Sequence, residues 1–248
     1  MMIDVNAWLG NYPFQKYRVD TVDKLDAELE SGGISRAYVS SIDSIFLGDP
    51  DQGNMALLAR IKGRRRLRPA VIINPVMGNW RELLGKYADL GVRLARLCPN
   101  YHGYRLVSSR GMGLLEEIGK RGLLPVVQVR VEDERTHHAR CRVPGVKTAD
   151  IAECALKLGG MPVIACCGYF DEVVSLVRRT KNVYADISMV ERLDTVASLL
   201  KEVPAGRVLF GSHTPFLYTR AAVSKVAAPG ITEGNRNKIR AGNISKIL

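Results

Sequence analysis

The sequence predicts a single-domain α/β protein, a (β/α)8 TIM barrel spanning residues 1–248. Eight short runs rich in Val, Ile and Leu recur along the chain, and helix-length amphipathic segments separate them. A chain of about 250 residues suits one barrel of this kind. The main alternative is an open doubly wound sheet, which usually carries a glycine-rich phosphate loop after its first strand. The segment AWLGNYPF occupies that place and has no such pattern.

The expected elements alternate regularly from one end of the chain to the other. The eight strands are expected at 2–8, 36–42, 68–74, 92–98, 124–130, 162–167, 182–188 and 207–212. Helices fill the intervals, and residues typical of helix starts precede three of them, at Asn79, Thr148 and Asp171. No linker rich in Pro, Gly or Ser interrupts this alternation, which favours one domain.

Charge indicates an anionic partner. The chain has 36 Lys and Arg against 25 Asp and Glu, a formal net charge of +11. No stacking aromatic residues are interleaved with the densest basic cluster, so a solvated helix end is preferred over a nucleic-acid site. That cluster comprises Lys62, Arg64, Arg65, Arg66 and Arg68. We therefore expect a small anionic substrate and no nucleic-acid partner.

The cysteines and the apolar runs indicate the cellular compartment in which the protein is expected. The five cysteines are an odd number and form no CxxC pair, so reduced thiols are expected. No apolar run approaches the roughly 20 residues of a membrane-spanning helix. The N-terminal residues show no basic region followed by an apolar one, as an export signal would. A cytoplasmic protein without a membrane partner is the expectation.

Polar residues inside the first strand point to a site. In this fold the site lies at the carboxyl ends of the strands, and the face that packs on the helices is apolar. Side chains alternate along a strand, so the pattern predicts one face toward the helices and one toward the barrel interior. The outward set is Ile3, Val5 and Ala7, and the inward set is Asp4, Asn6 and Trp8.

Two further charged residues interrupt apolar strands. Arg96 belongs to the fourth strand and Asp186 to the seventh. A buried Arg is costly unless it is paired, so Asp186 is expected to pair with Arg96 or with a loop cation. For Asp4 and Asp186, hydrogen bonding to backbone at the barrel top is an equally consistent interpretation.

Several segments resemble a known family. IDVNAWLG resembles the opening strand of the amidohydrolase-related (amidohydrolase 2) family, and VLFGSHTPF resembles its closing-strand segment. RLCPNYHGY, NVYADIS and the terminal ITEGNRNKIRAGNISKIL are similar to further segments, in the family's order. The resemblance implies a (β/α)8 barrel of the metal-dependent hydrolase superfamily, which also contains metal-dependent decarboxylases.

The resemblance also implies positions for a metal, and these positions are altered. The family holds its metal, usually zinc, with a His-x-His pair on the first strand, a His on each of the fifth and sixth strands, and an Asp on the eighth. At the matching positions of this chain, Trp8 cannot ligate a metal, and the side-chain amides of Asn6 and Gln128 are poor ligands for one. We therefore expect no bound metal and no other cofactor. The matching positions hold Asn6, Trp8, Gln128, Cys166 and His213.

The loop after the fifth strand carries the most suggestive group of charges. General acid–base chemistry needs such groups within hydrogen-bond reach of a substrate, and Arg135 could clamp a carboxylate or phosphate. A solvated charged loop is the alternative interpretation. The residues are Glu132, Asp133, Glu134, Arg135, His137 and His138.

These observations predict a hydrolase of a C–N or C–O bond in a small anionic substrate. His213 or a carboxylate of residues 132–134 would activate water, and His137 is a further catalytic candidate. Substrate-binding roles are expected for residues that hold charge, donate to the oxyanion or orient the substrate. They are Asn6, Trp8, Asn74, Arg96, His102, Gln128, Arg135 and Asp186. A decarboxylase or lyase, or a non-catalytic ligand-binding barrel, is the alternative, and a homodimer is left open.

Overall fold

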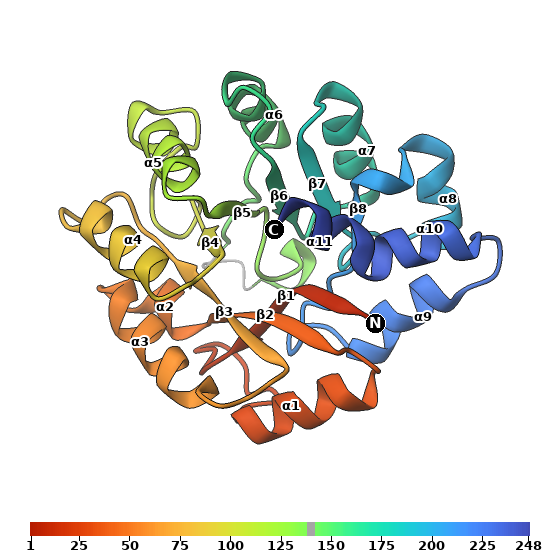
Figure 1. Ribbon diagram of the computed structural model, residues 1–248, viewed down its shortest axis with the longest axis horizontal. Helices are drawn as coiled ribbons and strands as arrows, with labels where there is room; N and C mark the ends of the chain where they lie inside the picture. The colour runs from red at the N-terminus through yellow and green to blue at the C-terminus, as the bar shows by residue number, and fades with distance from the viewer. Residues whose placement is uncertain (138–141) are drawn as a thin grey trace.

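The computed structural model describes residues 1–137 and 142–248, and these residues form the predicted barrel (Figure 1). Eight parallel strands follow one another around the sheet in chain order. Each lies within or next to an expected run, so the fold prediction is confirmed. The strands are β1 (Ile3–Leu9), β2 (Arg36–Ser41), β3 (Leu67–Ile72), β4 (Leu94–Leu97), β5 (Leu124–Gln128), β6 (Val163–Cys166), β7 (Val183–Asp186) and β8 (Val208–Leu209).

The ring closes just beyond the short strand β8. The His213 amide donates to the Asn6 carbonyl over 2.7 Å, and the Trp8 amide donates to the Thr214 carbonyl over 2.8 Å. Thr214 also forms a parallel bridge with Ala7. The first and last strand segments therefore lie side by side, and Asn6 and His213 share one wall of the barrel.

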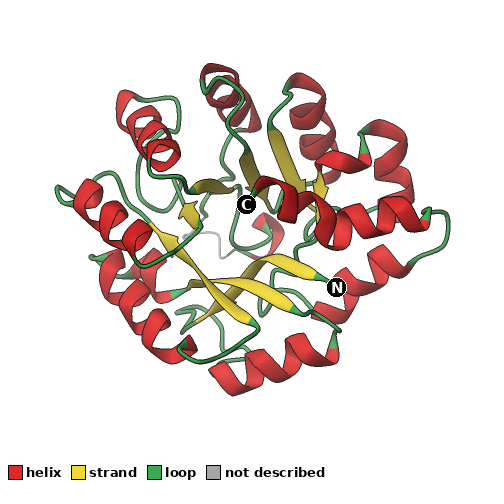
Figure 2. Cartoon of the chain, viewed as in Figure 1, coloured by secondary structure: helices red, strands yellow, loops and turns green. Residues whose placement is uncertain are grey.

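Helices surround the barrel (Figure 2). Short turns of 3-10 helix are η1 (Glu134–Thr136) and η2 (Ala205–Arg207), and η3 (Lys238–Gly242) is π-helical. Among the described residues, every helix is too short or too polar to cross a bilayer. The α-helices are α1 (Val22–Ser31), α2 (Asp43–Phe46), α3 (Pro50–Ile61), α4 (Trp80–Asp89), α5 (Ser109–Lys120), α6 (Thr148–Lys157), α7 (Phe170–Arg179), α8 (Thr195–Glu202), α9 (Thr219–Ala227), α10 (Glu233–Asn237) and α11 (Asn243–Ile247).

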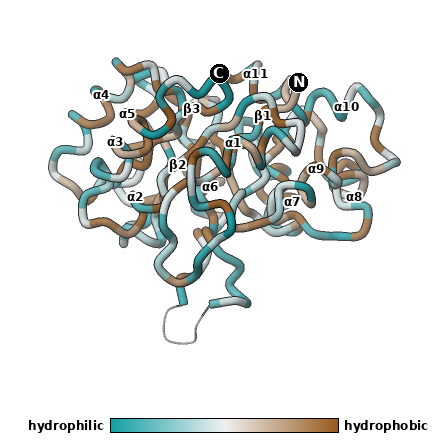
Figure 3. The backbone as a smooth tube through the Cα atoms, turned by 90° about the horizontal axis from the view of Figure 1, so that it is seen from below, coloured by the Kyte–Doolittle hydropathy of each residue, from teal (hydrophilic) through white to brown (hydrophobic). Residues whose placement is uncertain are grey.

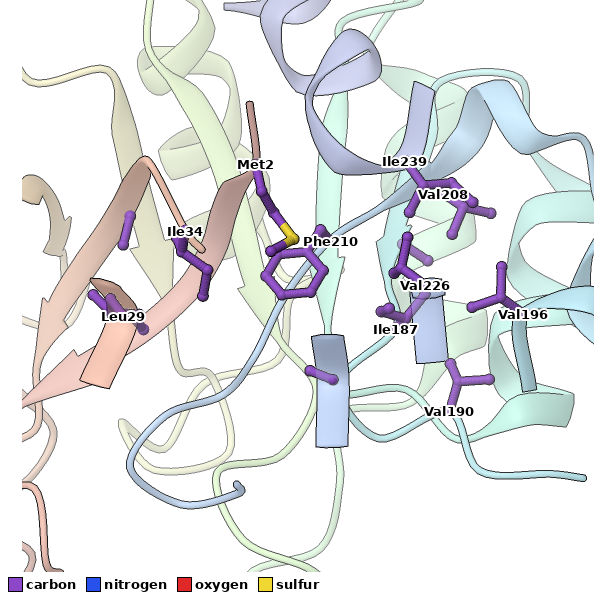
Figure 4. Close-up of a cluster of buried hydrophobic side chains, with 14 of the residues drawn as sticks. Met2, Leu29, Ile34, Ile187, Val190, Val196, Val208, Phe210, Val226 and Ile239 are labelled. Carbon is purple, nitrogen blue, oxygen red and sulfur yellow. The ribbon is translucent and has the colours of Figure 1, made fainter. Parts of the chain in front are cut away.

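Helix α7 illustrates why these segments pack as they do. Its buried residues, Phe170, Val173, Leu176 and Val177, recur at helical spacing and form one apolar face. Asp171 and Glu172 lie in the first turn, where they complement the positive end of the helix dipole. Similar faces from other helices meet the outward side chains of the strands, as Figure 4 shows for Val196 and Val226 beside Val208.

One end of the barrel is closed by the C-terminal segment. Ala241 and Ile244, from η3 and α11, pack in the same cluster as the inward residues Leu94, Val126 and Leu209. Figure 3 shows both termini at this end. The loops that follow the carboxyl ends of the strands lie at the opposite end, which is the mouth of the barrel.

The structure corrects the predicted facing of β1. Ile3 and Val5 pack in the inner cluster rather than on the helices, so their predicted outward facing is wrong. The register with β2 shifts between Asp4 and Ala7, where three steps along β1 match two along β2. Such a bulge changes which face the following side chains occupy. Asn6, beyond Asp4, therefore faces inward as predicted.

Asp4 lies at the β1–β8 seam, away from the barrel interior that strict alternation predicted for it. Its carboxylate accepts hydrogen bonds from the amide of Asn6 over 2.9 Å and from the amide and hydroxyl of Ser212 over 3.0 and 2.5 Å. Ser212 Oγ in turn accepts from the Thr214 amide over 3.1 Å, and the Thr214 hydroxyl contacts that of Thr219 in α9. Asp4 therefore links the first and last strand segments where the barrel closes. Burial raises the pKa of Asp4 to about 6.

Candidate active site

The centre of the barrel holds a buried guanidinium. Arg96 extends inward from β4 and has no solvent exposure. Its Nε donates to Ser40 Oγ over 2.8 Å, and its Nη2 donates to the Val5 carbonyl over 2.9 Å. Its Nη1 donates to Asn6 Oδ1 over 3.1 Å and to Gln128 Oε1. Four oxygen atoms from the three strands β1, β2 and β5 thus converge on one cation.

Asn6 connects this cation to the buried carboxylate of Asp186. While its Oδ1 accepts from Arg96, its Nδ2 donates to Asp186 Oδ2 over 2.8 Å. The expected pairing of Arg96 with Asp186 is therefore indirect. Asp186 also accepts from the amide of Cys167 over 2.9 Å and from the hydroxyl of Ser188. Burial raises the pKa of Asp186, and these hydrogen bonds oppose the shift.

His213 is fixed in a neutral form beside this group. Its Nε2 lies 2.6 Å from the Val131 carbonyl, which can only accept, so Nε2 carries the proton. Its Nδ1 then accepts from Trp8 Nε1 over 3.1 Å. Burial lowers the pKa of His213 to about 3. Both ring nitrogens are occupied and the residue has no exposed surface, which does not fit the expected role as general base.

The metal-ligand positions implied by the family resemblance meet in this central network, but their side chains do not fit the metal. The side-chain oxygens of Asn6 and Gln128 accept hydrogen bonds from Arg96. The Trp8 ring centroid lies 4.7 Å from Cζ of the same guanidinium. In residues 1–137 and 142–248, no three His, Cys, Asp or Glu side chains are grouped as metal ligands would be. Cys166 is buried, and burial raises the pKa of its thiol.

A cavity of about 340 Å³ opens at the mouth, lined by the loops that follow β1, β2, β4 and β5. We call it the mouth cavity. Four of its lining rings form a continuous chain, with neighbouring centroids 5.5–6.0 Å apart. They belong to Tyr12, Phe14, Phe46 and Tyr101. A small planar molecule fits a cavity of this size and lining.

Glu132 and His137 face this cavity together. Glu132 Oε2 accepts from the Tyr12 hydroxyl over 2.6 Å and lies 3.8 Å from His137 Nε2, while Oε1 accepts from the Tyr17 hydroxyl over 3.5 Å. The side chains are 17% and 5% exposed, respectively. Burial and the Glu132 carboxylate both raise the pKa of Tyr12 and Tyr17, so each phenol stays a donor. Acid–base groups therefore meet an enclosed volume here.

Asp133, Glu134 and Arg135 of this loop do not line the mouth cavity. Asp133 pairs with Arg135, which is 76% exposed, and this contact lowers the pKa of Asp133 to about 2. Glu134 pairs with Arg130 over 3.3 Å. The expected clamp role of Arg135 and the expected acid–base roles of Asp133 and Glu134 lack a substrate volume in this arrangement. His138 lies outside the described residues.

Two other expected substrate-binding residues also lie away from the mouth cavity. Asn74 accepts a hydrogen bond from the Val76 amide over 3.0 Å, which is a turn interaction. His102 is largely buried, and within the described part of the chain its ring nitrogens have no hydrogen-bond partner. Burial lowers the pKa of His102 to about 4.

The aromatic lining is the part of the site that the sequence did not reveal. Tyr12 and Phe14 follow the first strand directly, and Tyr101 follows the fourth. In a barrel, residues just after the strands gather at the mouth, so the position of these rings was an available signal. The position of Phe46 was harder to predict, because this residue ends a short helix that the sequence pattern did not suggest.

Comparison with known proteins supports the fold. No protein-family model matches the sequence, and no curated protein does. Solved structures match over 99–100% of this chain and 96–99% of their own. They include 2,6-dihydroxybenzoate decarboxylase from Rhizobium (16% identity, TM-score 0.75), 5-carboxyvanillate decarboxylase from Sphingomonas paucimobilis (12%, 0.75) and a putative amidohydrolase from Staphylococcus aureus (12%, 0.74). At these identities the likeness shows a TIM barrel.

Proposed function

We propose that this chain is a hydrolase that cleaves a C–N or C–O bond of a small molecule in the mouth cavity, without a metal. The observation that carries the proposal is the Glu132–His137 pair facing an aromatic-lined cavity. In this fold the site is expected at the carboxyl ends of the strands, which is where the cavity lies. The likeness to a putative amidohydrolase agrees with this class of reaction.

The pair can perform the proton transfers that hydrolysis needs. His137 takes a proton from water as the water oxygen attacks the substrate carbon, and it returns the proton to the leaving nitrogen or oxygen as that bond breaks. Glu132, held by the Tyr12 hydroxyl, stabilises the imidazolium between these steps. The 3.8 Å separation is longer than a hydrogen bond, and such contacts often shorten once substrate is bound.

Decarboxylation is the second candidate, because several solved structures that match this chain are decarboxylases, of dihydroxybenzoates or of 5-carboxyvanillate. An aromatic cavity suits a benzene ring equally well. In that reaction His137 would deliver a proton to the ring carbon that loses CO2. The two reactions share a site and differ in the product released.

Turnover assays separate these functions. Purified protein is incubated with a panel of amides, amidines, lactones and hydroxybenzoates, and release of ammonia, acid or CO2 is measured. Replacing Glu132 with Gln or His137 with Gln should each lower kcat/KM by about 10²–10⁴. Arg135→Ala is the matched control, since Arg135 lies outside the cavity, and it should retain activity.

The metal-free part of the proposal has its own test. Activity should survive dialysis against a chelator, and elemental analysis of protein purified without chelator should find less than stoichiometric transition metal. Loss of activity on chelation that added zinc or manganese restores would refute it.

A further inference from the structure

Building on the proposed function, we infer that the mouth cavity selects a substrate carrying a cationic nitrogen group, such as an amidinium or ammonium, beside a planar apolar part. This differs from the anionic substrate that the net charge of the chain suggests. The inference rests on the charges and rings that face the cavity.

The first argument is the charge of Glu132. The carboxylate lies mostly buried against two phenol hydroxyls. Among residues 1–137 and 142–248, His137 is its one ion-pair partner, and no Lys or Arg reaches it. A carboxylate removed from water is destabilised unless a cation compensates it. A cationic group of a ligand would supply that compensation, whereas a ligand carboxylate would add repulsion.

The second argument is the ring lining. The faces of aromatic rings attract cations, and the attraction is stronger where water is excluded. In the described part of the chain, Arg and Lys side chains lie over other rings, such as Arg96 over Trp8 and Arg130 over Tyr169. Among residues 1–137 and 142–248, no Arg or Lys lies over the four rings of the cavity, Tyr12, Phe14, Phe46 and Tyr101.

Nearby charges do not reverse this preference. Arg142 also lines the cavity, but it is exposed to solvent, where salt and water screen its charge. Asp133 and Glu134 are engaged by arginines outside the cavity. The dense basic cluster, residues 62–68, precedes and begins β3 and therefore lies at the end of the barrel opposite the mouth.

Three probes of one shape test the inference. Benzamidine, benzamide and benzoate share size and planarity but carry positive, zero and negative charge. Calorimetric titration of the full-length protein at pH 7.5 should give benzamidine an affinity about tenfold above that of benzamide. Benzoate should bind more weakly than benzamide. Benzoate binding as tightly as benzamidine would overturn the inference.

Variants connect the preference to the residues. Glu132→Gln keeps the shape of the side chain and should bring the affinities of benzamidine and benzamide together. Glu134→Gln is the control and should keep the tenfold preference, because Glu134 lies outside the cavity. Phe14 is 63% exposed, so Phe14→Leu is expected to fold. It should reduce the ratio of the two affinities, and an unchanged ratio in both Glu132→Gln and Phe14→Leu would refute the inference.

These outcomes are independent of turnover. A cationic preference in a protein that hydrolyses no member of the panel would support the inference and count against the proposed hydrolase. Hydrolysis that prefers anionic substrates, with Glu132 required, would support the hydrolase and overturn the inference.

Discussion

The central guanidinium offers the sharpest test of how this barrel is stabilised. Arg96→Met removes the charge and its donors while keeping an unbranched apolar side chain in the same space. Arg96 donates to four buried oxygens, and two of these keep another interaction when it is removed. Asn6 Oδ1 still accepts from Trp8, and Ser40 still donates to the Ala70 carbonyl.

The expected loss of stability in Arg96→Met follows from the buried groups that lose their partner. Gln128 Oε1 loses its donor, and an unsatisfied buried oxygen costs about 1–3 kcal/mol. Asp186 loses the positive charge that favours its ionised form. Breaking a buried charged network by removing one member typically costs about 3–5 kcal/mol. We expect Arg96→Met to lower the free energy of unfolding by that amount, and Tm by about 6–20 °C for a chain of this size.

Urea denaturation followed by circular dichroism measures the change, with thermal unfolding as a second readout. The double variant Arg96→Met/Gln128→Met removes the orphaned amide and should recover about 1–3 kcal/mol of the loss. Arg96→Met within about 1 kcal/mol of the unmodified protein would show that the network contributes little net stability. The reasoning about the barrel centre would then be wrong.

Three further predictions concern burial. Because the pKa of His213 is about 3 when folded against 6.5 ordinarily, the His213 contribution to stability should fall in acid, by about 3 kcal/mol at pH 4.5, while Asp4 acts in the opposite direction. The His213→Asn variant should lack this contribution, so its urea midpoint should fall less than that of the unmodified protein when the pH is lowered from 7.5 to 4. The Asp4 pKa of about 6 lies above its usual 3.8, so ionisation costs stability as pH rises through 6. Asp4→Asn should therefore raise the midpoint at pH 7.5, and a lower midpoint would contradict this. A Cβ at Gly211 would lie 2.3 Å from Asp186 Oδ2, so Gly211→Ala should lower Tm sharply while the open position Gly206→Ala should not.

The fold could be predicted because a parallel barrel requires simple hydrophobic patterns in the sequence. Strands buried on both faces need runs of apolar residues, and the helices between them need one apolar face. Segments such as 124–128 and 163–166 satisfy the first condition. The facing of β1 could not be predicted, because the register shift between Asp4 and Ala7 leaves no mark in an alternating pattern.

The candidate site was predicted only in part, because its contacts join distant segments. The resemblance brought Asn6 and His213 together correctly, and the hydrogen bond between their main chains supports that placement. It did not reveal that Tyr12 donates to Glu132, which is 120 residues away. Which acid of residues 132–134 faces the cavity depends on the path of the loop. Nothing in the local sequence distinguishes Glu132 from Glu134, which binds Arg130 instead.

The buried guanidinium explains why the acid–base groups would lie at the mouth and not at the barrel centre. A bound metal has exchangeable positions for water, whereas every N–H of Arg96 is directed at protein or enclosed by it. Such a cation stabilises the strands that it joins but offers no surface to a substrate. Proton transfer then requires groups that are enclosed enough to interact strongly and open enough to meet a ligand. Within the described residues, Glu132 and His137 meet both conditions.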